Sequence, residues 1–244
     1  MARGGVDELL ARPALFVTGT DTDIGKTFVS CAIARAWRAR GDDVCAMKPV
    51  AAGGERDADG NFLCDDSKLL SEVTSARGRA AMMLATGLMP TSPLIGLDRA
   101  MAPWSAAVLQ GAKIDFTHLA ESLGSLEKMC AMEKVKLLAE GAGGALVPLC
   151  EGKTVADLIA EIKWPAVIVA RTELGTINHT LLTVEALRAR GIEIAAVVFS
   201  RTREGEFTEI ERAGFREIDA ILPQGIPLLM VKKNEPRIAR IDAD

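Results

Sequence analysis

Histidine, clustered cysteine and tyrosine are scarce or absent in this chain of 244 residues. The two histidines, His118 and His179, have no metal-ligand spacing and belong to no recognisable Ser-His-Asp arrangement. The five cysteines include no C-x-x-C pair and their number is odd, which argues against a disulfide framework and a structural zinc site. This cysteine usage predicts a reducing compartment, and we expect a cytoplasmic protein.

The sequence also lacks long apolar runs and blocks of charge of one sign. No apolar stretch approaches the length of a membrane span, and the N-terminal residues do not resemble a signal peptide. The net charge is −4, with both signs interspersed. This balance does not favour a nucleic acid or an anionic membrane, so we expect neither as a partner.

Short apolar segments alternate with amphipathic ones over much of the chain. We expect strands at 14–18, 44–47, 135–139, 166–170 and 194–199, and helices at 27–40, 154–161, 176–190 and 204–221. Continuously apolar strands separated by helices predict a mainly parallel sheet covered on both faces. The prediction is one doubly wound α/β domain over residues 1–244.

Three other regions carry weaker signals. Residues 1–12 are expected to form a loose N-terminal leader. Residues 53–64 are rich in Gly, Asp and Arg and are expected to be a loop. Residues 65–134 show helical stretches and a turn at Pro90–Pro93, but no clear topology.

Residues 16–27, FVTGTDTDIGKT, place a polar loop between a predicted strand and a predicted helix. The loop ends as the phosphate-binding motif G-x-x-x-x-G-K-[ST] does, but five residues, not four, separate Gly19 from Gly25. Backbone N–H groups at a helix start bind phosphate, Lys26 would neutralise it, and the Thr27 hydroxyl would bind Mg²⁺. An ordinary turn with a surface lysine is the alternative. The strand before and the helix after favour a P-loop nucleoside triphosphate hydrolase type of fold.

Further polar segments follow predicted strands and should meet at the same edge of the sheet. Lys48 follows the strand at 44–47, and Glu140 follows the strand at 135–139, where a Mg²⁺ partner is expected. The alternative for Lys48 is an ordinary surface lysine. The alternative for Glu140 is a surface glutamate before a flexible glycine-rich loop. Asp65 and Asp66 also could be a solvated turn or a helix cap, and spacing alone selects neither.

Gly175–Asn178 opens a predicted helix, where free N–H groups attract an anion. Simple capping by Thr176 is the alternative reading.

Five motifs together resemble those of the dethiobiotin synthetases, ATP-dependent enzymes of biotin biosynthesis. They are FVTGTDTDIGKT, KPVAAGG, PTSP, EGAGG and LGTINH, and they cover most of the chain from residue 14 to about residue 200. The extra residue in the phosphate loop is that family's own form. The resemblance implies that 7,8-diaminopelargonate takes up CO₂ as a carbamate. ATP then activates the carbamate with Mg²⁺ present, and the second amine closes the ring.

The resemblance also implies roles for individual residues. Lys26, Lys48 and Thr22 would be catalytic, and Thr27, Asp66 and Glu140 would bind Mg²⁺, which selects Asp66 over Asp65. The implied nucleotide-binding residues are Asp23, Ile24, Gly25, Lys26, Thr27, Phe28 and Ser200. The implied substrate-binding residues are Thr22, Lys48, Ala52, Gly143, Gly144, Gly175, Thr176, Ile177 and Asn178.

The family further implies a homodimer with shared active sites, in which Gly175–Asn178 reaches the substrate of the other subunit. Some positions depart from its pattern. Ala52, Leu94 and Ser200 stand where the family commonly has serine, histidine and asparagine. Base preference is therefore left open.

A nucleotide-switch ATPase of the partitioning or septum-placement type is the alternative function. Such proteins carry a second lysine near the start of the phosphate loop, where this chain has Asp21. A glutamine-dependent P-loop ligase would need a nucleophilic cysteine in a G-x-C-x-G setting, which is absent. A synthetase should release phosphate only with diamine and bicarbonate, whereas a switch should hydrolyse ATP without them.

Overall fold

The computed structural model describes residues 5–58, 60, 62–88, 92–201, 204–232 and 235–241. Within the turn expected at Pro90–Pro93, Pro90 and Thr91 lie outside the described residues.

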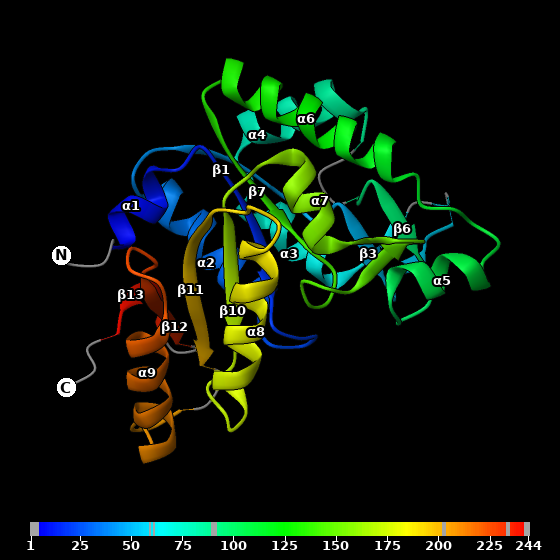
Figure 1. Cartoon of the computed structure of the whole chain (residues 1–244). Coiled ribbons are helices and arrows are strands. Elements are labelled where there is room, and N and C mark those ends of the chain that lie inside the picture. The colour runs from blue at the N-terminus through cyan, green and yellow to red at the C-terminus, as the bar shows by residue number, and fades with distance from the viewer. Residues whose placement is uncertain are drawn as a thin grey trace.

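A seven-stranded sheet forms the centre of the molecule (Figure 1). Its strands, in spatial order, are β13 (Glu235–Arg240), β12 (Leu228–Lys232), β11 (Ile194–Arg201), β10 (Ala166–Ala170), β1 (Ala14–Gly19), β7 (Val135–Glu140) and β2 (Asp43–Met47). All neighbours pair in parallel except β12 and β13, which pair antiparallel. The five expected strands are all present, and β12 and β13 extend the sheet beyond them.

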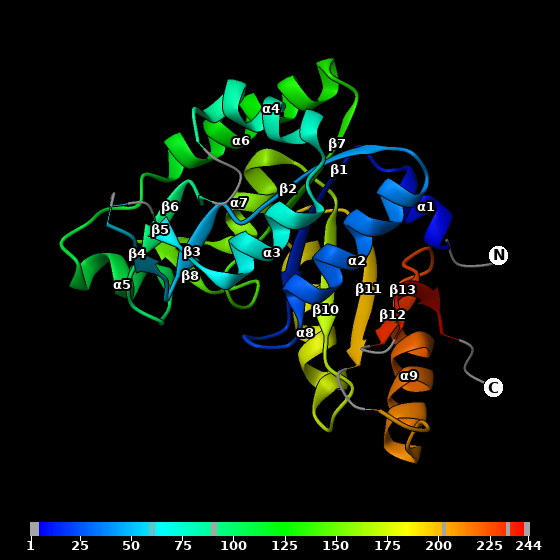
Figure 2. The same cartoon turned by 180° about the vertical axis from the view of Figure 1, so that it is seen from behind.

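Helices cover both faces of this sheet. One face packs against α1 (Val6–Ala11), α2 (Lys26–Ala39) and α3 (Asp65–Val73), and α2 and α3 lie in front of the strands in Figure 2. The other apolar cluster includes α4 (Ala76–Thr86), α6 (Phe116–Met132), α7 (Val155–Ile162), α8 (Thr176–Arg188) and α9 (Glu209–Ile221). Side chains along β1 alternate between the clusters: Phe16 belongs to the second and Val17 to the first. The doubly wound α/β fold is therefore confirmed.

Smaller elements lie together to one side of the large sheet (Figures 1 and 2). They are the parallel pair β3 (Val50–Ala52) and β6 (Ile95–Leu97), the antiparallel pairs β4 (Glu55–Arg56) with β5 (Phe62–Leu63) and β8 (Pro148–Cys150) with β9 (Lys153–Thr154), and helix α5 (Pro103–Leu109). The expected loop at 53–64 was wrong where β4 and β5 form. Strands of two residues are too short to show a periodic pattern.

The N-terminal leader was also wrong for residues 6–11, which form α1. Leu9 and Leu10 are buried, and the indole Nε1 of Trp37 donates a hydrogen bond of 2.9 Å to the Leu10 carbonyl. The amphipathic signal was hidden because this helix has only 6 residues.

Helix α9 begins at Glu209, five residues later than expected. Thr208 accepts from the N–H of Glu211, and the Glu211 carboxylate accepts from the N–H of Thr208, so this capping box fixes the start. No helix in the described part of the chain is long and apolar enough to cross a membrane.

Candidate active site

The phosphate-loop sequence connects β1 directly to α2. Gly25 is the N-cap of α2 and has φ 85°, a conformation that favours glycine. A Cβ atom at Gly25 would also collide with the Ser200 hydroxyl, so the close approach of β11 is a second reason for glycine here. Lys26 begins the helix, and its Nζ donates a hydrogen bond of 2.8 Å to the Asp21 carbonyl.

Three oxygen-bearing side chains meet beside the start of α2. The Thr27 hydroxyl lies 2.7 Å from Asp66 Oδ1 and 2.8 Å from Glu140 Oε1. One hydroxyl proton can serve only one of these carboxylates at a time. Ser30 donates to the other oxygen of Glu140 at 2.8 Å and so holds this fully buried side chain in place.

Lys48, directly after β2, joins the two carboxylates. Its Nζ donates to Asp66 and, at 3.1 Å, to Glu140 Oε1. Burial alone would lower the pKa of Lys48, but attraction from Glu140 and Asp66 outweighs it and raises that pKa. Burial would likewise raise the pKa of Asp66, but the Lys48 charge lowers it. Lys48 is therefore held as a cation.

Lys26 has the opposite balance. Burial lowers its pKa, and the nearby Lys48 charge adds to that effect, while Glu140 and Asp66 only partly offset it. An incoming anion would favour the charged form of Lys26, so this lysine is suited to bind phosphate.

The three oxygens fit a magnesium ion by their chemistry. Hydroxyl and carboxylate oxygens are the hard ligands that Mg²⁺ prefers, usually alongside phosphate and water. Among the described residues no group of three or more His, Cys, Asp or Glu side chains could hold a metal ion. A cation here would thus depend on the Thr27 hydroxyl and on nucleotide oxygens as well as on Asp66 and Glu140.

A cavity of about 680 Å³ opens over these groups. Eleven of the predicted site residues line it: Thr22, Asp23, Ile24, Gly25, Lys26, Thr27, Lys48, Ala52, Asp66, Glu140 and Gly143. The structure thus brings the phosphate loop, the strand-end lysine and the proposed metal ligands to one space. Asp66, not Asp65, is among the lining residues.

Three other predicted residues lie beside the cavity but do not line it. Gly144 packs against the phosphate loop, where an added Cβ would lie 3.4 Å from the Gly19 and Thr20 carbonyls. Ser200 is buried behind Gly25, and its hydroxyl has no partner among the described residues. Phe28 packs against the core beneath α2.

Gly175–Asn178 does not line the cavity of its own chain either. Gly175 caps α8 with φ 93°, and the buried Thr176 hydroxyl donates a 2.6 Å hydrogen bond to the Arg171 carbonyl. The Thr176 side chain therefore faces inward, whereas Asn178 is exposed.

Sequence reasoning missed several residues of the site. Ser30 follows Thr27 by three residues on α2, so helical spacing could have identified it. Val147, Ala142 and the segment 100–103 also line the cavity. They are small or apolar and carried no chemical signal.

These features define the class: a P-loop nucleotide-binding protein. The AAA domain family matches residues 13–230. A solved ParA family ATPase from Chlorobium tepidum has a TM-score of 0.51 and 12% identity, with 92% of this chain and 86% of that chain covered. At this identity the likeness shows the fold alone.

Sequence relatives give the particular family. The ATP-dependent dethiobiotin synthetase BioD of Anaeromyxobacter dehalogenans is 39% identical over 219 residues, which cover 86% of this chain and 89% of that protein. The corresponding protein of Bacillus velezensis is 36% identical, with 78% and 74% covered. The chain belongs to the dethiobiotin synthetase family, which comprises ATP-dependent ligases of biotin biosynthesis. The resemblance inferred from the five motifs is confirmed.

Proposed function

We propose that this chain converts 7,8-diaminopelargonate, CO₂ and ATP into dethiobiotin, ADP and phosphate, with Mg²⁺ as cofactor. The observation that carries the proposal is the meeting of Lys26, Lys48, Thr27, Asp66 and Glu140 at one cavity. A ring closure of this kind needs little covalent chemistry from the protein. It needs a carbamate held in line with a γ-phosphate and donors for the developing charge.

In the proposed reaction one amine attacks CO₂ and loses a proton, giving a carbamate. A carbamate oxygen then attacks the γ-phosphorus and ADP leaves. The second amine attacks the carbamate carbon, a proton is lost and phosphate leaves, which closes the ureido ring. Lys48, kept cationic by Glu140 and Asp66, would bind the carbamate and γ-phosphate oxygens as charge develops.

Lys26 must change partner for this reaction. It now donates to the Asp21 carbonyl, and it would exchange that acceptor for phosphate oxygen when ATP binds. Thr27, Asp66 and Glu140 would hold Mg²⁺, which when bound neutralises charge on phosphate oxygens. Ser30 fixes the orientation of Glu140 through its 2.8 Å hydrogen bond.

The cavity walls suit an aliphatic diamine. Away from the phosphate loop the cavity is lined by small and apolar side chains, among them Ala52, Met101, Ala102 and Val147. These would enclose the hydrocarbon chain of the substrate, while Lys48 and Thr22 meet its reacting end. The family commonly has serine at the position of Ala52. The methyl side chain of Ala52 lines the cavity and can make no hydrogen bond to the substrate.

We further propose a homodimer in which Gly175–Asn178 binds the carboxylate of the partner's substrate. This segment starts a helix of 13 residues, and it does not line the cavity of its own chain.

A cytoplasmic location is also proposed, supported by five cysteines that form no disulfide. Recovery of the protein in a membrane or periplasmic fraction would contradict this proposal.

The decisive assay follows phosphate release and dethiobiotin formation by mass spectrometry. The proposal requires both products to depend on diamine and on CO₂, and the Lys48→Ala variant to lose both. ATP hydrolysis that is the same with and without diamine would instead support the nucleotide switch. Nucleotide switches of the partitioning type share this fold. They carry a lysine at the position of Asp21, where this chain has the opposite charge.

A further inference from the structure

Asp21 places a carboxylate within the loop that is expected to hold phosphate. Its Oδ1 accepts the N–H of Thr22 at 2.8 Å, and its backbone carbonyl accepts Lys26 Nζ at 2.8 Å. Asp21 therefore shapes the loop through both its side chain and its backbone. A negative charge at this position opposes the binding of a polyanion, so the proposed function leaves its presence unexplained.

The guanidinium of Arg171 pairs with this carboxylate. Arg171 Nη2 donates to Asp21 Oδ2 at 2.6 Å. The two residues are 150 positions apart in sequence, but β1 and β10 are adjacent parallel strands and bring them together. The Thr20 N–H also donates to the Val169 carbonyl at 3.0 Å, which ties the loop to the same strand.

The position of Arg171 is fixed by its backbone. Its carbonyl accepts the hydroxyl proton of the buried Thr176 at 2.6 Å. Its Nε atom is buried and has no hydrogen-bond partner in the described part of the chain. The guanidinium thus contacts Asp21 at one point, and its main effect on the loop is its charge.

We propose that Arg171 is a positioning residue for the nucleotide, which acts by neutralising Asp21. It allows the loop to keep a carboxylate that orders Thr22 and Lys26 without repelling the triphosphate. The inference rests on the proposed use of ATP. It assigns a role to a residue outside the phosphate-loop motif, and it explains how aspartate is tolerated where partitioning ATPases carry lysine.

The test measures nucleotide binding by calorimetry, so it does not depend on turnover. For Arg171→Gln we expect Kd for ATP to rise about tenfold, because the Asp21 charge is then unopposed. The rise should be smaller for ADP and smallest for AMP, which carry less charge. Arg171→Lys, which keeps the charge, should bind ATP nearly as well as the wild type.

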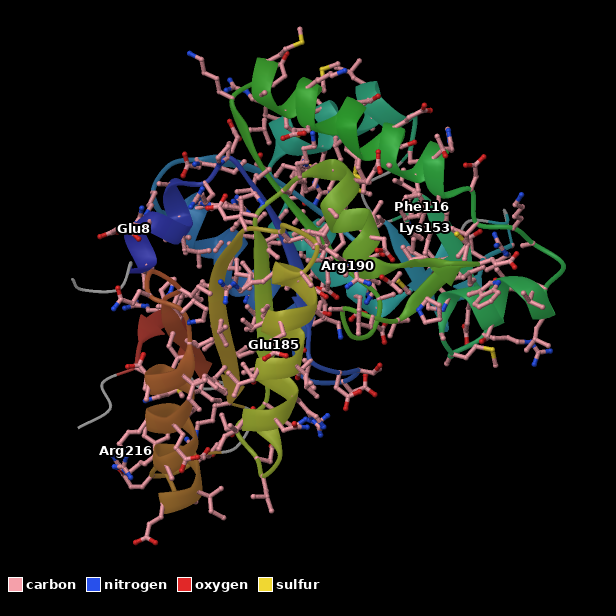
Figure 3. All side chains as sticks on the ribbon, viewed as in Figure 1. Glu8, Phe116, Lys153, Glu185, Arg190 and Arg216 are labelled. Atoms are coloured by element: carbon pink, nitrogen blue, oxygen red, sulfur yellow. The ribbon has the colours of Figure 1, made fainter. Side chains whose placement is uncertain are left out.

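Rescue separates charge from structure. The double variant Asp21→Asn/Arg171→Gln should recover most of the lost ATP affinity, since neither charge remains. Arg190→Gln is the matched control. Arg190, labelled in Figure 3, follows α8 and pairs with Asp157 of α7 at 2.9 Å, and its loss should leave Kd unchanged.

Two outcomes would overturn the inference: an equal loss of affinity for ATP and AMP, or a double variant no better than Arg171→Gln. Either would mean that the ion pair only supports the loop's shape. Failure of the wild type to bind ATP at all would be a different result, since it would remove the proposed function itself.

Discussion

At the residue scale, the site combines two lysines held in different electrostatic states. Lys48 donates to two carboxylates, while Lys26 donates to a backbone carbonyl. The motif at 25–27 predicted Lys26 and Thr27, and strand-end position predicted Lys48 and Glu140. Asp66 required the family resemblance, because spacing could not separate it from Asp65. Only the fold brings residues 27, 66 and 140 together.

Lys48→Ala should lower kcat on the order of 10²–10³-fold, the scale for loss of a preorganised electrostatic donor. Phosphate release at saturating ATP and diamine measures the effect. Lys68→Ala is the control, since Lys68 is exposed on α3 two residues from Asp66. A Lys48→Ala enzyme with a kcat close to that of the control would contradict the assigned role.

Glu140→Gln should weaken magnesium activation, because an amide oxygen replaces a buried carboxylate ligand. Titrating Mg²⁺ against phosphate release should give a half-saturation value at least about tenfold higher than in the wild type. Asp65→Asn serves as the control, because Asp65 does not line the cavity. Overlapping titration curves for Glu140→Gln and wild type would remove Glu140 from the metal site.

At the element scale, continuous apolar patterning predicted β1, β2, β7, β10 and β11, because their side chains are buried on both faces of the sheet. β12 was missed although Leu228–Val231 is apolar, and β13 pairs antiparallel at the sheet edge, where alternation with Arg237 weakens the pattern. α1 was missed because six residues cannot show helical periodicity. Whether such a short helix or strand forms depends on the residues against which it packs, and a sequence pattern does not show these.

Docking of α1 can be tested by stability. Leu10→Ala should lower the free energy of unfolding by about 2–4 kcal/mol, since it leaves a cavity against the core. Urea denaturation measures the change. Glu8→Ala is the control on the same helix, because Glu8 is exposed and extends outward in Figure 3. Equal stability of the two variants would show that α1 is not docked.

The start of α9 is tied to the sheet by a buried ion pair. Arg201, the last residue of β11, donates to Glu211 at 2.8 Å. Burial alone would raise the pKa of Glu211, but hydrogen bonds from Arg201 and Thr208 outweigh it and lower that pKa to about 2. A lowered pKa stabilises the fold above the unfolded value near 4.3, and this contribution is lost as the pH falls toward about 2.

Glu211→Gln should therefore cost about 3 kcal/mol at pH 7, where it leaves Arg201 buried without a charge partner. The difference from the wild type should shrink as the pH is lowered from about 5 to about 3. Urea denaturation at several pH values checks both. Glu217→Gln, at an exposed position on α9, should cost little at any pH. A pH-independent difference for Glu211→Gln would contradict the ion-pair explanation.

At the scale of the whole molecule, the proposed homodimer would complete each site with residues from two chains. The phosphate loop and Lys48 line the cavity, but the helix start expected to bind the substrate carboxylate does not. The family resemblance implies this separation, whereas the motifs taken alone give order along the chain and not position in space.

Complementation between two inactive variants tests whether sites are shared. Lys48→Ala removes the lysine of the cavity. Asn178→Asp places a negative charge at the exposed start of α8, where it should repel the substrate carboxylate. In a mixed dimer with shared sites, one site would be intact and the other would carry both lesions. Mixing the variants after reversible dissociation should therefore restore roughly a quarter of wild-type activity, because about half of the dimers are mixed and each has one of two sites working.

If each site is built from one chain, every site in a mixed dimer carries a lesion. Activity no higher than the sum of the separate variants would then exclude the shared-site arrangement.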